Sequence, residues 1–234
     1  MVRGAVTEVG SGVMRSRCNA AILVVLVVVL AGCTHVGGGT GVAASPVPHA
    51  SGIIVAAGHG WTPAGLDGPI PPPGSCHIRQ AADGRPLPDP ACTPGAIDGA
   101  VTDADTATTV CRKGGYTSSV RPPESLTEPA KRRLLAAYGI PESQIGGYEL
   151  DHLIDLAAGG ASDVRNLWPE PDTFTQFHPS GFVHNDKDAV ESYTFHAICA
   201  GKVTVSAVQN AMATNWTTTV ATLGLPPIPP DYQG

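Results

Sequence analysis

Hydrophobic and polar positions alternate over residues 148–154, YELDHLI. This period of two is typical of a strand, and it places His152 on one face and Asp151 on the other. The pair Gly159-Gly160 then signals a turn, and residues 166–168 form a second short extended piece before a proline. The pattern therefore predicts two short strands on either side of a glycine turn.

A helical spacing of apolar positions follows Thr127. Thr127 is a suitable N-cap, Pro129 suits a first turn, and Gly139 stands where the apolar pattern stops. We therefore expect a helix over residues 128–138.

Two further helices are predicted near the end of the chain. The first covers residues 186–199 and ends before Gly201. Ser206 is expected to cap the second, which runs to about residue 216. Prolines become frequent after Leu223 and stop regular structure.

The longest apolar run, AAILVVLVVVL, covers residues 20–30 near the start of the chain. Two arginines precede it and LAGC follows it, which is typical of an export signal and too short for a good membrane-spanning helix. LAGC resembles the lipobox of bacterial lipoproteins, in which the cysteine becomes the lipidated first residue, here Cys33. The sequence predicts a signal peptide over residues 1–32 and attachment to the outer side of the cell membrane through Cys33. The alternative is an ordinary cleaved signal with an incidental cysteine.

Gly, Ala, Pro and Ser dominate residues 34–75, which include GGGTG and PIPPPG. Such a composition buries little apolar surface, so we expect a disordered tether over residues 33–75. The expected folded domain covers residues 76–223, and a Pro-rich tail covers residues 224–234.

The charge balance is acidic. The whole chain has a formal charge of −6 from 14 basic and 20 acidic side chains. Residues 1–32 hold three of these basic side chains and one acidic one, so a mature chain keeps 11 and 19, a formal charge of −8. Nonspecific nucleic-acid binders usually carry a basic surface, so this balance argues against tight DNA binding but not against a small catalytic site.

The cysteines predict disulfides. Beyond the signal and the lipidated position, four remain, at Cys76, Cys92, Cys111 and Cys199. An even number in an exported protein favours disulfides, and no CxxC pair supports a zinc site. Three pairings are possible; we favour Cys76–Cys92 with Cys111–Cys199.

The segment from Tyr148 to Gly160, followed by NLWP at residues 166–169, resembles the HNH endonuclease family. Those nucleases share a DH…GG…NL pattern with an Asn about fourteen positions after the His, the spacing between His152 and Asn166. Other segments also resemble exported HNH-type proteins, and the resemblance covers roughly residues 92–216. It implies a ββα-metal finger, made of the two strands and the helix that follows them.

Phosphodiester hydrolysis needs a water deprotonated near neutral pH and a cation beside the phosphate. His152 is the expected base, since its ordinary pKa of about 6.5 suits that task. Asp151 is a hard oxygen ligand for a divalent ion, with Mg²⁺ expected and Mn²⁺ or Zn²⁺ as alternatives. The resemblance implies that Asn166 braces the loop and helps to hold the base.

The second metal ligand is expected in HNDK, residues 184–187, which fits the HxxK pattern found in HNH helices. His184 is the first choice and Asn185 the second. Asp188 with Glu191 is the third choice, although carboxylates at this spacing on a helix are more often solvated.

Arg112 and Arg121 are candidates for binding the substrate phosphates. Asp155 departs from the resembling proteins, which commonly have proline after DHLI. It supplies another ligand or it weakens phosphate approach, and the sequence leaves both open.

The sequence thus predicts a small, disulfide-braced α+β domain with a ββα-metal finger and flanking helices. The expected function is that of an extracytoplasmic, metal-dependent HNH-type endonuclease with nucleic acid as substrate. No obligate protein partner is indicated. The alternative is a catalytically inactive surface lipoprotein that uses the same fold as a binding scaffold.

Overall fold

Helices and small two-stranded sheets together make up the part of the chain that the computed structural model describes, residues 52–172 and 183–234. The fold is therefore α+β, as predicted. The expected signal peptide, Cys33 and the first part of the expected tether lie outside the described residues. So does most of the insertion that precedes His184.

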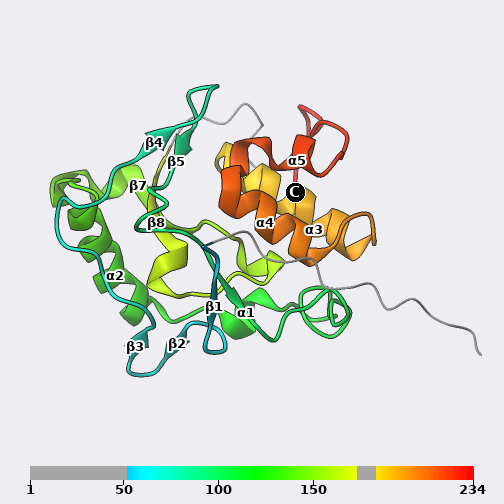
Figure 1. Ribbon diagram of the computed structural model, residues 1–234, viewed down its shortest axis with the longest axis horizontal. Helices are drawn as coiled ribbons and strands as arrows, with labels where there is room; N and C mark the ends of the chain where they lie inside the picture. Colours follow the sequence, from blue (N-terminus) through cyan, green and yellow to red (C-terminus); the bar gives the residue numbers. More distant parts are fainter. Residues whose placement is uncertain (1–51, 173–182) are drawn as a thin grey trace, which may run out of the picture. The chain divides into compact units, whose positions relative to one another are not determined.

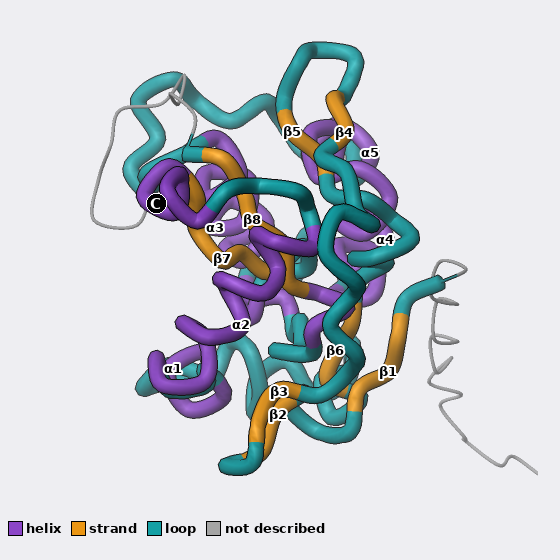
Figure 2. The backbone as a smooth tube through the Cα atoms, turned by 90° about the vertical axis from the view of Figure 1, so that its left-hand side faces the viewer, coloured by secondary structure: helices purple, strands orange, loops and turns teal. Residues whose placement is uncertain are grey.

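Three small sheets are built from the first half of the described chain. Strand β1 (Ile54–Ala56) pairs in parallel with β6 (Ala96–Asp98), and Figure 2 shows the two side by side. The antiparallel pairs are β2 (Trp61–Thr62) with β3 (Gly65–Leu66), and β4 (Arg79–Gln80) with β5 (Pro86–Leu87).

The predicted tether over residues 33–75 is wrong from residue 52 onward. Ala56 of β1 is buried, and the indole Nε1 of Trp61 donates to the main-chain oxygen of Val120 at 2.7 Å. Turn-rich composition concealed these strands because β1 gains its hydrogen bonds only from β6, about forty residues later in the chain.

Strands β7 (Tyr148–His152) and β8 (Leu167–Pro171) form an antiparallel hairpin in which Asp151 faces Trp168 and His152 faces Leu167. The predicted strand over residues 148–154 is two residues too long, because the main chain turns into a buried loop after His152. Adjacent residues on a strand point to opposite faces, so Asp151 and His152 diverge.

The helices flank this hairpin. Figure 1 shows α2 on one side of β7 and β8, and α3, α4 and α5 gathered on the other. The α-helices are α1 (Thr117–Val120), α2 (Glu124–Ala137), α3 (Asp186–Cys199), α4 (Val205–Asn215) and α5 (Thr219–Thr222). Short 3₁₀ helices cover Glu142–Gly147, Leu156–Ala158, Val164–Asn166 and Trp216–Thr218.

Two helix starts differ from the prediction. Helix α2 begins at Glu124, so Thr127 does not cap it and Pro129 lies in its second turn. Pro129 has no N–H to donate to the main-chain oxygen of Ser125. Both residues are exposed, so leaving this oxygen without a helical hydrogen bond costs little stability. The cap of α4 is Thr204, whose side chain accepts from the Ala207 N–H, and not Ser206.

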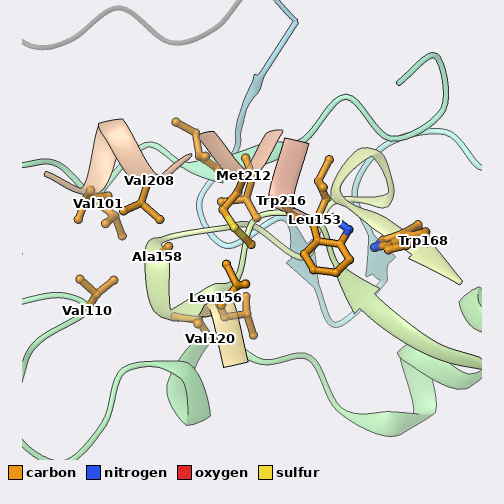
Figure 3. Close-up of a cluster of buried hydrophobic side chains, with 14 of the residues drawn as sticks. Val101, Val110, Val120, Leu153, Leu156, Ala158, Trp168, Val208, Met212 and Trp216 are labelled. Atoms are coloured by element: carbon orange, nitrogen blue, oxygen red, sulfur yellow. The ribbon is translucent and has the colours of Figure 1, made fainter. Parts of the chain in front are cut away.

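The main core lies between the loop after β7 and helix α4. Figure 3 shows Leu153 and Leu156 from that loop beside Met212 and Trp216. Each of these side chains is at most 3% exposed, and burying one contributes roughly 1.5–3 kcal/mol. This packing fixes the position of the loop that continues from Asp151-His152.

Both disulfides form as predicted. Cys76 bonds Cys92 across 16 residues, and Cys111 bonds Cys199 across 88 residues. The second bond ties the chain before α1 to the last residue of α3. No helix in residues 52–172 and 183–234 is long and apolar enough to cross a membrane.

Candidate functional site

His152 ends β7 with its imidazole held by a serine. Nε2 lies 2.9 Å from the Ser162 hydroxyl, which is fully buried on the loop after the Gly159-Gly160 turn. This contact leaves Nδ1 as the ring nitrogen without a hydrogen bond to any described residue. The His152 residue is 9% exposed, so the ring is nearly enclosed and has one restricted opening.

That opening is a cleft of about 300 Å³ between α2 and the hairpin. Arg121 and Lys131 line it together with His152, and so do Glu124, Glu128, Glu149 and the apolar side chains of Leu150 and Leu167. The structure thus brings one predicted phosphate-binding residue, Arg121, to the same cleft as the predicted base.

Arg112 has a different environment. Its guanidinium lies over the Tyr116 ring, 5.4 Å from the centroid, and its Nε donates to the main-chain oxygen of Gly115 at 2.9 Å. Arg112 is not among the residues that line the His152 cleft.

The charge state of His152 follows from its surroundings. Burial first, and then the positive charges of Arg121 and Lys187, lower the pKa of the imidazole from 6.5 to about 3. The ring is therefore neutral at physiological pH and able to accept a proton, although as a weaker base than a free imidazole.

Asp151 faces away from this cleft, toward α3. Its Oδ2 accepts from the Trp168 indole Nε1 at 2.8 Å and pairs with the Lys187 ammonium at 2.8 Å. The Lys187 side chain is only 1% exposed. A cationic group is therefore already bound to the predicted metal ligand.

The other predicted ligands serve the start of α3. The Asn185 amide donates to the Glu149 carboxylate, and its Oδ1 accepts from the Asp188 N–H at 3.0 Å as the helix cap. His184 is exposed, and its main-chain N–H donates to Asp188 at 2.8 Å. Within the described ranges, no group of three or more His, Cys, Asp or Glu side chains is arranged to hold a metal ion. As arranged here, Asp151 and Asn185 already have side-chain partners, and His184 is exposed.

Asn166 braces the loop between the two strands. Its amide Nδ2 donates to the main-chain oxygens of Ile154 and Ala161, both at 2.9 Å, and its Oδ1 accepts from the Ile154 N–H at 3.0 Å. These bonds fix the chain on both sides of the Gly159-Gly160 turn. They hold Ser162 close to His152 through the main chain.

Carboxylates gather on the Asp151 face of the hairpin. Glu149 and Glu170 are opposite each other in register. Burial, followed by the charges of Asp151 and Asp188, raises the pKa of Glu149 to about 7. Burial, together with Asp151, raises the pKa of Glu170 well above its usual range, and its Oε2 has no hydrogen-bond partner among the described residues.

Asp155 lines a separate hollow of about 340 Å³ with Asp188, Glu191 and His196. Burial raises the pKa of the Asp155 carboxyl. Because Asp155 lines this other hollow, it is not part of the cleft that His152 faces.

His59 and Asp98 form a hydrogen-bonded pair that the sequence did not indicate. Nδ1 of His59 lies 2.5 Å from Asp98 Oδ2, which also accepts from the Tyr116 hydroxyl at 3.2 Å. The main-chain oxygen of His59 accepts from the Ser162 N–H at 2.8 Å, so Ser162 contacts both histidines. No periodicity or motif marks residues so far apart in sequence. Ser162 also has no sequence signal, whereas Lys187 stands in the HNDK segment as its last residue.

Comparison with protein-family models, curated proteins and solved structures gave no match.

Proposed function

We propose that this protein is an exported HNH-type phosphodiesterase that cuts nucleic acid, with β7, β8 and α3 as its ββα finger. The observation that carries the proposal is the neutral imidazole of His152 at the end of β7, which opens to a cleft lined by Arg121 and Lys131. The Asn166 brace at fourteen residues from His152 supports the same interpretation.

The chemistry follows from this cleft. A phosphate between Arg121 and Lys131 gains two positive partners. Its negative charge offsets that of Arg121, which raises the pKa of His152 and makes Nδ1 a better base. A water oxygen then bonds to phosphorus while Nδ1 takes its proton. The phosphorus–oxygen ester bond breaks, and the leaving oxygen takes a proton from solvent.

The proposed mechanism uses no metal ion, and the need for a divalent metal is tested by varying the metal in the cleavage assay. Asp151 and Asn185 already bond other side chains, so no step is assigned to a metal ion. The expected place of action is the outer face of the cell membrane, through lipidated Cys33. Two disulfides support an oxidising compartment.

Plasmid nicking and RNA cleavage by the purified, oxidised protein test the function. Both should be measured with Mg²⁺, with Mn²⁺ and in EDTA. His152→Ala should reduce cleavage by roughly 10²–10⁴-fold, the usual contribution of a general base. His77→Ala, at a side chain 79% exposed, is the matched control. Cleavage that survives in His152→Ala would exclude His152 as the base.

Arg121→Gln tests whether the Arg121 side of the cleft binds phosphate. We expect weaker substrate binding and a smaller dependence of binding on salt, because one phosphate contact is lost. Arg132→Gln is the control, since Arg132 is exposed and does not line the cleft.

The second candidate is a catalytically inactive lipoprotein that binds a partner through the same fold. The near-complete enclosure of His152 favours it, since only 9% of the residue is exposed. Absence of cleavage under all three metal conditions, in protein with both disulfides formed, would support this candidate.

A further inference from the structure

The ammonium of Lys187 is coordinated as a bound cation would be. Its Nζ lies 2.8 Å from Asp151 Oδ2 and 2.8 Å from the main-chain oxygen of His152, and it also donates to the Glu191 carboxylate. An ammonium has three N–H donors, and these three oxygens accept all of them. The group is therefore fully satisfied and closed off from solvent at 1% exposure.

This ammonium stands beside the predicted metal ligand. Asp151 Oδ2 already accepts from Lys187 and from the Trp168 indole, so an ion at this oxygen must displace one of them. A divalent ion would also lie beside a buried positive charge, which repels it.

Lys187 lies between two nearly buried carboxylates. The Asp151 side chain is 12% exposed and that of Glu191 is 15% exposed, and both contact the ammonium. Moving the ammonium away would leave these buried carboxylates unpaired, which is strongly unfavourable.

We propose that Lys187 is the resident cation of this centre: its ammonium takes the place of a divalent ion at Asp151 and fixes the strand end that carries His152. Lys187 touches the His152 main chain and not the substrate, so it is a positioning residue. The inference rests on the proposed function for its catalytic consequence, which is cleavage that needs no added metal.

The first test uses the wild-type protein. Cleavage in EDTA should equal cleavage with Mg²⁺ or Mn²⁺ within about twofold, after prior removal of metals by dialysis. Cleavage abolished by EDTA and restored by Mg²⁺ would overturn the inference and leave the proposed function intact.

The second test measures metal binding without activity. Mn²⁺ titrated into the wild-type protein should give no specific heat of binding and no rise in melting temperature. Lys187→Ala and Lys187→Gln vacate the place beside Asp151 and Glu191, so either variant should bind Mn²⁺ and become more stable with it. Lys202→Ala, at an exposed lysine, should behave as wild type.

The outcomes separate the two proposals. Stoichiometric Mn²⁺ binding by the wild-type protein at Asp151 overturns the Lys187 assignment, as does failure of a folded Lys187 variant to gain binding. If both variants fail to fold, the wild-type titration and the EDTA assay decide. If the protein cleaves nothing under any condition, the proposed function fails, and the titration alone judges Lys187.

Discussion

The side chain of Asn166 bonds both main-chain groups of Ile154, accepting from its N–H at 3.0 Å and donating to its oxygen at 2.9 Å. These two hydrogen bonds take the place of the main-chain bonds that a neighbouring strand would make, just beyond the end of β7. It closes the loop that carries the Gly159-Gly160 turn and Ser162. The Asn166 amide thus joins the first residues of the loop to the segment after its glycine turn.

Asn166→Ala should lower the free energy of unfolding by roughly 2–4 kcal/mol, because it leaves one buried N–H and two buried oxygens without this partner. Urea denaturation followed by circular dichroism measures the change. Gln144→Ala, at an exposed position, is the control. A loss no larger than that of the control would show that water or a local shift replaces the amide.

Gly160→Ala should destabilise the protein by at least about 3 kcal/mol or prevent folding, because a Cβ there would lie 1.8 Å from the Ile154 oxygen. Gly146→Ala is a close control, since its Cβ would meet no heavy atom within 4 Å. Soluble yield and melting temperature report both variants. Equal stability of the two would contradict the close approach described for residue 160.

Glu149 makes stability depend on pH. The pKa of its carboxyl is about 7 in the folded protein and about 4.5 in the unfolded chain. Between these values the folded state binds the proton more tightly, so this group lowers stability as pH rises from 4.5 through 7. Glu149→Gln should remove that decline. The stability of the variant relative to wild type should therefore be higher at pH 8 than at pH 4.

Melting temperatures across pH 4–8 measure the effect. Glu142→Gln, at a side chain 75% exposed, should leave the wild-type slope unchanged. A parallel slope in wild type and Glu149→Gln would mean that folding does not shift the pKa of Glu149.

The two disulfides should differ in their contribution to stability. The Cys111–Cys199 bond closes 88 residues and the Cys76–Cys92 bond closes 16. Loop-closure entropy predicts that the long-range pair contributes about 1.5 kcal/mol more. Urea midpoints of the paired Cys→Ser variants test this order, and a larger loss from the short-range pair would contradict it.

Sequence predicted best where local chemistry decides. Helix α3 has the predicted bounds, residues 186–199, because Asn185 and Asp188 form a capping box at its start. The disulfide pairing was also predicted correctly, and both strands of the hairpin were located to within three residues.

Sequence failed where distant segments decide. Strand β1 lies in a stretch that reads as a linker, and only its pairing with β6 makes it a strand. The HNDK segment likewise gives no sign that Lys187 is the residue that reaches Asp151. Which residue of a helix turn meets a strand depends on how the two pack, and no local pattern encodes that.

Ser162 uses its main-chain N–H for His59 and its hydroxyl for His152. The turn between β1 and β2 is thus hydrogen-bonded to Ser162, the residue that also orients the His152 imidazole. Gly60 permits this contact, since a Cβ there would lie 2.5 Å from the Asp163 nitrogen. A shortened protein that begins at Cys76 would lack His59 and its hydrogen bond to Ser162, so a version that keeps this contact must include the turn between β1 and β2.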